Sequence, residues 1–480
     1  MKHVLTFLTV ILCSFYAFSQ NPNPSASIDS EIEAIMDSRR LPGTSTVVVK
    51  DGEIVWMQSY GYANTDLQAP FTDTTSLMLA SISKVFTGVA LMQLYEDGLF
   101  SLDDDINDYL PFDVLIPNYE SHPITFRMLM THTSSIRDNW NAMNNYYNNN
   151  GDPTISLAEC MERYFSTSGS DYNQNQNFFN SQPGTVYQYS NMASALSGYL
   201  VEVISGMPFN EYCNQHIFTP FCMNNTRWFL SEYPNLNAVA NPHDFFSSQY
   251  DPIDHYGFAD YPNGLLRSNV SDLANFMITI LQNGTFHNEE LLSSASINSM
   301  FTEQIPSIET RQGLKFYKEN FSVSGGNILL WGHSGGEYGI GTEMYFDHDN
   351  NMGIAVIANG DNDPYEILEI LYDYGLTLSP SGVGNPDCDF ISSIQETKAL
   401  NSFTIYPNPA NDIVIFENDN LTTDQHKIII SDLTGRKIIQ ALTSEPKKEI
   451  NVSNLPMGVY FYSIRTNSNL IETGRLIIND

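Results

Sequence analysis

The residues best suited to carry out chemistry are Ser81 and Lys84, which form an S-x-x-K pattern within residues 79–87. On a helix, a spacing of three residues places the hydroxyl and the amine on one face, within reach of each other. A lysine in a pocket that disfavours its charge loses its proton more easily and can then accept the proton of the serine. Ser-Lys hydrolases use such a pair in place of a Ser-His-Asp triad. The pattern therefore predicts serine acyl-transfer chemistry, and the alternative is a helix-start serine beside an unrelated, solvated lysine.

The chain contains a second S-x-x-K pattern, from Ser444 to Lys447. Pro446 lies inside it, removes a backbone donor and disfavours a helix, so this copy is interpreted as a chance match. After Ser81, by contrast, apolar residues recur at helical spacing through residues 82–95 and end at an Asp-Gly pair. Ser81 is therefore predicted to open an amphipathic helix.

A Ser-Lys enzyme needs a second group that handles protons and a site for the oxyanion. Tyr189 and Asn191 offer a phenol and an amide just before a helical pattern at residues 192–204. Tyr-x-Asn recurs elsewhere in this chain, and an isolated tyrosine commonly serves packing. The order of the motifs, rather than Tyr-x-Asn itself, makes Tyr189 a candidate.

A glycine-rich segment at residues 332–336 follows an apolar run and supplies the third element. A strand that ends in glycines lets a backbone N–H approach a substrate carbonyl, so Gly336 is a candidate oxyanion donor. The same residues satisfy G-x-S-x-G, and a rival hypothesis makes Ser334 the nucleophile of an α/β-hydrolase, which requires a helix directly after the serine. Residues 339–346 instead look extended and lead through a polar turn into the run 353–357, which predicts a hairpin.

The N-terminal residues 1–19 have the layout of a cleaved export signal, with a short basic start, an apolar run and a polar end. No later segment offers the roughly 18 consecutive apolar residues of a membrane span.

The formal net charge of −34 argues against nucleic acid or an anionic membrane surface as a partner. Cys213 and Cys222 could form a disulfide, although their spacing does not establish it.

The length of 480 residues and the hydrophobic content of 42% suit a large folded enzyme of two or three domains. Residues 379–400 begin with a Ser/Pro/Gly-rich stretch that is typical of a linker, and from Phe403 onward short alternating runs predict a small all-β sandwich. The predicted organisation is a signal at 1–19, a hydrolase-like domain at 20–378, the linker, and an accessory domain at 401–480.

Taken in order, the three elements resemble the serine beta-lactamase family, which includes class C beta-lactamases, D-alanyl-D-alanine carboxypeptidases and related esterases. Connecting segments such as 94–104, 124–135 and 263–268 also resemble that family, and the likeness spans about residues 30 to 375. The resemblance implies an α+β fold, in which an antiparallel sheet is flanked by helices and a helical subdomain, with the active site in the cleft between them.

The resemblance also implies roles for individual residues. Ser81 would attack the carbonyl, Lys84 and Tyr189 would share its proton and later activate water, and the backbone N–H groups of Ser81 and Gly336 would stabilise the oxyanion. Asn191 would orient the substrate. His333, in an H-x-G form of the third motif, replaces the lysine usual in class C beta-lactamases, which weakens the case for antibiotic resistance and is compatible with peptidase or esterase relatives. It would transfer a proton, or else only cap its strand or hydrogen-bond Tyr189.

The last domain resembles the C-terminal sorting domain of type IX secretion, through segments 405–412, 432–437 and 455–460. This resemblance implies handling by the type IX machinery and delivery to the cell surface or the exterior through the periplasm. An adhesive β-module is the alternative. No cofactor follows, and the Asp-His-Asp-Asn stretch at residues 347–350 is expected to be a hairpin turn rather than a metal site.

The expected function is that of a secreted serine hydrolase acting through an acyl-enzyme on an ester, a D-amino-acid peptide or a β-lactam. The alternative is a catalytically silent surface protein that binds peptidoglycan or peptides in the same cleft. The Asn-rich segment 138–151 is either a loop over the cleft or a mobile surface insertion.

Overall fold

The computed structural model describes residues 21–287, 289–382, 403–418, 426–431, 437–466 and 469–479. The predicted signal at 1–19 and most of the predicted linker lie outside the described residues. Contacts along the chain divide it into two compact units, residues 1–388 and 389–480. Each unit is described by itself.

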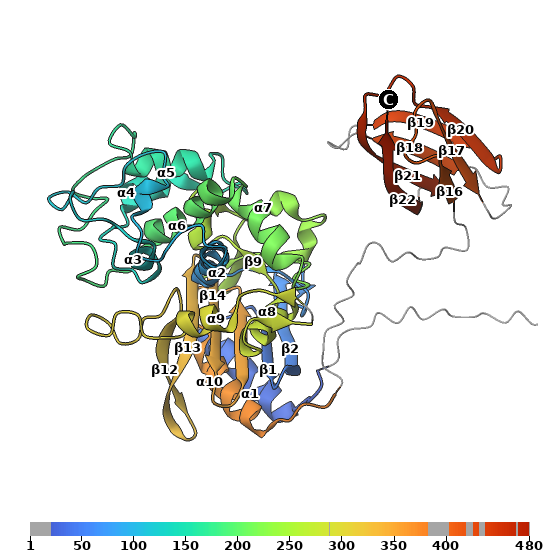
Figure 1. Ribbon diagram of the computed structural model, residues 1–480. Coiled ribbons are helices and arrows are strands. Elements are labelled where there is room, and N and C mark those ends of the chain that lie inside the picture. The colour runs from blue at the N-terminus through green and yellow to red at the C-terminus, as the bar shows by residue number, and fades with distance from the viewer. Residues whose placement is uncertain are drawn as a thin grey trace, which may run out of the picture. The chain divides into compact units, whose positions relative to one another are not determined.

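The first unit is built on a seven-stranded sheet in which all neighbouring strands are antiparallel. The predicted hairpin is confirmed, because β14 turns directly into β15. The sheet is assembled from the two ends of the unit, since β1 pairs with β15 (Figure 1). In spatial order the strands are β12 (Tyr317–Val323), β13 (Gly326–Glu337), β14 (Ile340–Asp347), β15 (Met352–Ala358), β1 (Gly43–Lys50), β2 (Glu53–Asn64) and β3 (Ala69–Pro70).

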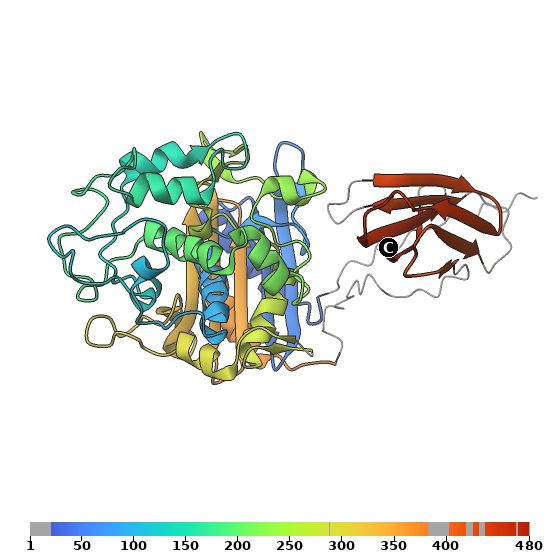
Figure 2. The ribbon, with the colours of Figure 1, turned by 45° about the horizontal axis from the view of Figure 1, so that its top comes forward.

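Helices cover both faces of this sheet. Along β1, Val47 and Val49 belong to one hydrophobic core and Val48 to another, because successive side chains of a strand point to opposite faces. Helices α1 (Ala26–Arg39) and α10 (Tyr365–Thr377) pack on the face of Val48, and α8 (Val270–Leu281) packs on the other. Figure 2 shows the β1–β2 strands in blue and the strands of residues 326–358 in orange behind the helices.

A helical region lies beyond the face that α8 covers, and α2 packs against α6 at its centre. The predicted helix after Ser81 is confirmed as α2, but it is buried on nearly every side rather than amphipathic, because other elements enclose it. The remaining helices are α3 (Phe126–Met130), α4 (Trp140–Met143), α5 (Leu157–Phe165), α6 (Asn191–Ser205), α7 (Phe209–Cys213) and α9 (Ser294–Met300), with α2 at Ser83–Glu96.

Short strand pairs tie these helices to the loops between them. Each pair is antiparallel and only two to four residues long. The pairs are β4 (Leu77–Met78) with β9 (Arg267–Ser268), β5 (Tyr147–Asn148) with β8 (Gly257–Phe258), β6 (His243–Phe246) with β7 (Gln249–Pro252), and β10 (Thr285–Phe286) with β11 (Glu289–Glu290).

The second unit is a small all-β structure, as predicted. Residues of both its sheets, such as Val414 and Ile464, share one hydrophobic core. The second S-x-x-K copy is not helical: Lys447 begins β20 and pairs with Glu417 at 2.9 Å. One sheet contains β16 (Phe403–Tyr406), β17 (Ile413–Asn418) and β20 (Lys447–Asn451), and the other contains β19 (Lys437–Thr443), β18 (His426–Ser431), β21 (Gly458–Thr466) and β22 (Asn469–Ile478).

Two further points concern export and cysteine pairing. Within the ranges that the structure describes, no helix has both the length and the apolar character needed to cross a membrane. Cys213 is a free, buried thiol, so the Cys213–Cys222 disulfide that the spacing left open is not formed.

Candidate active site

Ser81 lies in a tight 3₁₀ turn, η1 (Ala80–Ile82), that immediately precedes α2. Ala80 has a φ of 46°, in the left-handed region, where a residue with a side chain pays roughly 1–2 kcal/mol. The turn is held from two sides: the Leu79 N–H donates to Leu266 O at 2.7 Å, and Thr342 Oγ1 donates to Leu79 O at 2.9 Å. Packing from distant segments therefore maintains a strained turn at the serine, as is common where a reactive group must be presented.

Lys84 is fully buried one helical turn after Ser81, and its Nζ donates to Ser81 Oγ at 2.9 Å. Burial lowers the pKa of this lysine to about 7, partly opposed by the negative charges of Asp138, Glu337 and Asp260. A substantial fraction of the side chain is therefore a neutral amine near pH 7, in contact with the hydroxyl that it would deprotonate. The predicted Ser-Lys pair is brought together.

The other side of Lys84 rests on the segment 260–268. Its Nζ donates to the backbone oxygen of Asn263 at 2.7 Å. The amide of Asn263 in turn donates to Asp260 Oδ2 at 2.7 Å. Asp260 is buried, which raises the pKa of its carboxyl to about 7. Asn263 thus links the buried carboxyl group of Asp260 to Lys84, the candidate proton acceptor.

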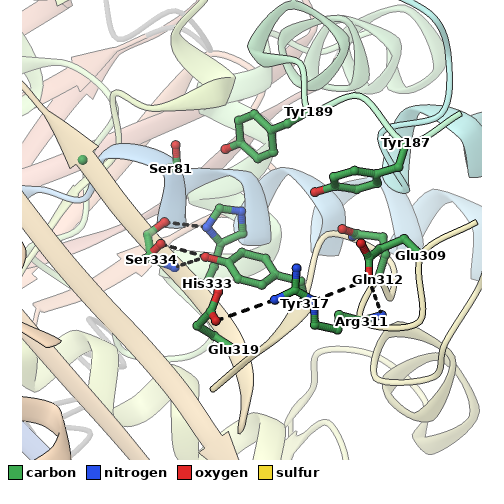
Figure 3. A pocket seen from close by; sticks show the side chains of 11 residues that line it. Ser81, Tyr187, Tyr189, Glu309, Arg311, Gln312, Tyr317, Glu319, His333 and Ser334 are labelled. Carbon is green, nitrogen blue, oxygen red and sulfur yellow. Dashed lines mark hydrogen bonds and ion pairs between the residues drawn. The ribbon is translucent and has the colours of Figure 1, made fainter. Parts of the chain in front are cut away.

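Tyr189 faces Ser81 from the opposite wall, and Figure 3 shows its hydroxyl pointing toward the serine. Lys84 Nζ lies 5.1 Å from the centre of the Tyr189 ring. Loss of hydration raises the pKa of this phenol well above its ordinary value, and its hydrogen bond with Ser81 only partly opposes that effect. Tyr189 is therefore a protonated donor at neutral pH, and Lys84 is the group better placed to accept a proton.

His132 fixes the position of Tyr189. Its ring stacks on the Tyr189 ring with centroids 4.4 Å apart. The backbone N–H groups on either side of the tyrosine also bind it: Gln188 N–H donates to His132 O at 2.7 Å, and Ser190 N–H donates to His132 Nδ1 at 3.2 Å. Burial lowers the pKa of His132 well below its usual range, which leaves Nδ1 free to accept.

Asp138 fixes the start of α6, directly after Tyr189. Its carboxylate accepts hydrogen bonds from Ser190 Oγ at 2.9 Å, Asn191 N–H at 2.9 Å and Met192 N–H at 3.0 Å. A carboxylate at a helix N-terminus satisfies unpaired N–H groups and interacts favourably with the helix dipole. The segment 138–151 thus begins with a residue that anchors the Tyr189 motif.

The end of β13 lies against the turn of Ser81, and the residue that permits this approach is Gly335. A Cβ atom there would lie 2.4 Å from Leu79 O, 2.4 Å from Thr342 Oγ1 and 3.0 Å from Ser81 N. The predicted oxyanion donor, Gly336, has open space where its Cβ would be. Gly335 therefore allows β13 to approach the turn of Ser81 closely, and Gly336 is the residue that faces the cavity.

The N–H of Gly336 points away from β14. Ser334 N–H donates to the hydroxyl of Tyr317 on β12, and N–H groups two residues apart point to the same side of a strand. The pairing of β12 starts with Tyr317 opposite Gly332, so no β12 residue stands opposite Gly336. Its N–H therefore faces the open edge, an orientation that suits an oxyanion site.

The rival nucleophile Ser334 is excluded by its surroundings. It lies inside β13, no helix follows it, and its Oγ is hydrogen-bonded to the Tyr317 hydroxyl at 2.7 Å. His333 is buried beside it and donates from Nδ1 to Ser334 O at 2.6 Å. Burial and the nearby Lys84 lower the pKa of His333 to about 3, so its imidazole is neutral.

A cavity of about 300 Å³ opens over Ser81 (Figure 3). Asn191, predicted to orient the substrate, is the first residue of α6 and does not line this cavity. Segment 138–151 does not line it either; Tyr146 is buried and β5 pairs with β8, so much of the segment is structured. The lining residues are Ser81, Tyr187, Tyr189, Glu309, Arg311, Gln312, Tyr317, Glu319, His333, Ser334 and Gly336.

Sequence reasoning did not assign roles to His132, Asp138, Asp260 or Tyr317. His132 lies in the connecting segment 124–135, and Asn263, which joins Asp260 to Lys84, lies in the segment 263–268. The resemblance of these two segments to the family pointed to them, but it gave neither residue a role. Asp138 lies about fifty residues before the tyrosine that it supports, a separation that carries no pattern. Tyr317 precedes its partner Ser334 on a neighbouring strand, and only the register of β12 and β13 brings them together.

Comparisons with known proteins show what each unit of the chain is similar to. Residues 28–373 match the Beta-lactamase family model, and residues 404–479 match the Secretion system C-terminal sorting domain model. Protein flp of Staphylococcus aureus (strain MW2) is 23% identical over 335 residues, which cover 69% of this chain and 62% of that protein. Penicillin-binding protein 4* of Bacillus subtilis (strain 168) is 25% identical over 362 residues, which cover 71% and 73%.

Solved structures show the same fold at low sequence identity. The octameric penicillin-binding protein homologue from Pyrococcus abyssi has a TM-score of 0.57 at 21% identity, and covers 94% of this chain and 99% of that one. The penicillin binding protein from Bacillus halodurans has a TM-score of 0.55 at 22% identity, over 71% and 98%. The match to the flp proteins spans about 62% of their length, so their full extent is not represented here.

Proposed function

This chain belongs to the beta-lactamase family, and from that premise we propose that it is an exported serine hydrolase that forms an acyl-enzyme on Ser81. The observation that carries the proposal is the 2.9 Å contact between Ser81 Oγ and the buried amine of Lys84. Acyl donors of three kinds suit this chemistry: an ester, a D-amino-acid peptide or a β-lactam.

In the first step, neutral Lys84 accepts the proton of Ser81 as its oxygen bonds to the substrate carbonyl carbon. The charge that develops on the carbonyl oxygen is stabilised by the backbone N–H groups of Ser81 and Gly336. The tetrahedral intermediate then expels the leaving group, which takes a proton from Tyr189 or from protonated Lys84. Expulsion leaves an ester of Ser81.

In the second step, water attacks that ester. The Lys84–Tyr189 pair accepts a proton from the water, the same N–H groups stabilise the second oxyanion, and Ser81 leaves with its proton restored. In each step, the Lys84–Tyr189 pair thus takes up one proton and gives one proton back. Asn191 is proposed to orient the substrate from the start of α6, although it does not line the cavity in this structure.

The second unit carries a secretion system C-terminal sorting domain, which indicates export to the cell surface or the exterior. We propose that residues 1–19 direct the chain to the periplasm and are removed there. The type IX machinery would then recognise the second unit, while the first unit performs the hydrolysis.

The test is intact-mass analysis of the mature protein and of Ser81→Ala after exposure to a fluorophosphonate and to a penicillin, with p-nitrophenyl acetate turnover in parallel. We expect an adduct and turnover that both vanish in Ser81→Ala. Wild-type protein that shows neither would favour a binding protein over an enzyme. Labelling that persists in Ser81→Ala would place the nucleophile elsewhere.

A further inference from the structure

The cavity over Ser81 has a charged end remote from the serine. Glu309, Arg311 and Gln312 come from the segment between α9 and β12, and Glu319 comes from β12. Figure 3 shows Arg311 between the two glutamates, with Tyr317 lying between Arg311 and Ser81. A substrate that fills this cavity from Ser81 would reach these charges with its far end.

Arg311 is already engaged by both carboxylates. Its Nε lies 3.4 Å from Glu309 Oε1, its backbone N–H donates to the same oxygen at 3.0 Å, and its Nη1 lies 3.7 Å from Glu319 Oε1. Two negative charges thus surround one positive charge. A carboxylate brought to this end would meet a guanidinium that two carboxylates already contact, within a group of residues whose formal net charge is negative.

No other lining residue of the described cavity carries a positive charge. His333 is neutral because its pKa is lowered to about 3, and Lys84 lies beneath the cavity, where it binds Ser81 and the Asn263 carbonyl. The fixed charge of the lining residues is therefore net negative, one guanidinium against two carboxylates.

We propose that Glu309 and Glu319 are specificity determinants that keep Arg311 from binding substrate, so that the enzyme rejects acyl donors with a carboxylate at their remote end and accepts uncharged ones. The inference rests on the proposed hydrolase function and narrows its substrate class. One uncompensated charge at 4 Å changes binding about five-fold in water, and by more at the lower dielectric of a cavity. Exchange of a glutamate for glutamine removes that charge and keeps the shape.

The experiment compares two donors of equal size, the mono-p-nitrophenyl ester of adipic acid and its primary amide, p-nitrophenyl adipamate. We expect wild-type kcat/KM to be at least about five-fold higher for the amide after subtraction of spontaneous hydrolysis. Glu309→Gln and Glu319→Gln should each narrow the ratio, and the double variant should reverse it, because Arg311 is then free. Preference of the wild type for the carboxylate, or a ratio unchanged in the double variant, would overturn the proposal.

The matched control is Glu303→Gln. Glu303 lies in the same segment, pairs with Lys318 at 2.8 Å and does not line the cavity, so the ratio should stay at its wild-type value. A ratio of two donors measured on one variant is insensitive to partial unfolding, which lowers both rates alike.

Binding to Ser81→Ala separates this inference from the proposed function. Adipic acid monoanilide and its primary amide are titrated calorimetrically into Ser81→Ala and into the same variant with both glutamates replaced. Preference for the amide that reverses in the latter supports the charge rule even if Ser81-dependent turnover is absent, in which case only the hydrolase function fails. Equal binding of both probes in every variant rejects the charge rule even where turnover is normal.

Discussion

The hydroxyl of Ser190 donates a hydrogen bond of 2.9 Å to the carboxylate of Asp138. The same carboxylate accepts the N–H groups of Asn191 and Met192, so one side chain satisfies the first turn of α6 and holds the residue that follows Tyr189. The position of the Tyr189 phenol over Ser81 therefore depends on a residue about fifty positions earlier in the chain.

Asp138→Asn should lower kcat/KM at least about ten-fold on the plateau above about pH 8, because an amide accepts these three hydrogen bonds poorly and Tyr189 loses its fixed position. The plateau is compared because loss of the Asp138 charge also lowers the pKa of Lys84, which affects the rate only at lower pH. Loss of a helix cap typically costs about 1–2 kcal/mol of stability, which denaturant unfolding would measure. The control is Asp152→Asn, since Asp152 also accepts two backbone N–H groups, from Leu230 and Ser231, but does not line the cavity over Ser81. Equal losses of activity in both variants would contradict the positioning role of Asp138.

The pH dependence of the reaction should follow Lys84. Its amine acts in the neutral form and its pKa is lowered to about 7, so kcat/KM for an uncharged ester should rise as the pH rises through about 7 and level off above. Asp260→Asn removes a carboxyl group whose negative charge raises the pKa of Lys84. Because the pKa of Asp260 is itself raised to about 7, this group is only partly ionised at the midpoint, so the rise should move to lower pH by less than removal of a fully ionised neighbour would cause. A pH–rate series on both proteins checks this, and a move to higher pH would show that Asp260 does not act through the charge of Lys84.

Much of the scaffold of the site could be predicted because its signals are local. The apolar spacing after Ser81 predicts α2, the pattern after Asn191 predicts α6, and the polar turn at residues 347–351 predicts the β14–β15 hairpin. Each depends on neighbours within a few residues, whose periodicity is visible in one sequence. The spacing of Ser81 and Lys84 is equally local, and the structure brings the two groups together.

The supports of the site could not be predicted because they are not local. Asp138, His132 and Asp260 reach Tyr189 and Lys84 across separations that no periodic pattern encodes. The prediction that α2 is amphipathic was wrong for the same reason, since elements distant in sequence cover the helix face that was expected to be exposed. For the two glycines, the sequence predicted the donor Gly336 but not the close contact of Gly335 with the Ser81 turn. Which glycine makes that contact depends on how the strand crosses the turn.

Gly335 and Gly336 should respond differently to alanine. Gly335→Ala places a Cβ 2.4 Å from Leu79 O, so β13 must move from the turn of Ser81; we expect a loss of about 1–3 kcal/mol in stability. Displacement of an oxyanion donor should also lower kcat about 100-fold or more. Gly336→Ala has open space and should fold with wild-type stability. Thermal unfolding and kcat of the two variants provide the comparison, and unchanged activity in Gly335→Ala would contradict the close approach.

His333 should not titrate in the range where the enzyme works. Its pKa is lowered to about 3, so its imidazole stays neutral above about pH 5 and can donate to the Ser334 carbonyl without taking part in proton transfer. His333→Gln should therefore leave the midpoint of the pH–rate rise in place, even if kcat falls. An NMR titration of the His333 ring should show no protonation between pH 5 and 8. A midpoint that moves in His333→Gln would assign the titration to the histidine instead of Lys84.

Removal of residues 401–480 should separate export from catalysis. The two compact units have separate hydrophobic cores, so the truncated chain should fold and its Ser81 should react with a fluorophosphonate as in the full-length protein. Without the sorting domain, however, the chain should accumulate in the periplasm, which fractionation and immunoblotting would detect. Full-length Ser81→Ala is the matched control, because it loses the nucleophile and keeps the sorting domain, and it should be exported normally. Export of the truncated chain at the level of this control would contradict the sorting role, whereas a truncated chain that no longer reacts would show that the first unit needs the second to fold.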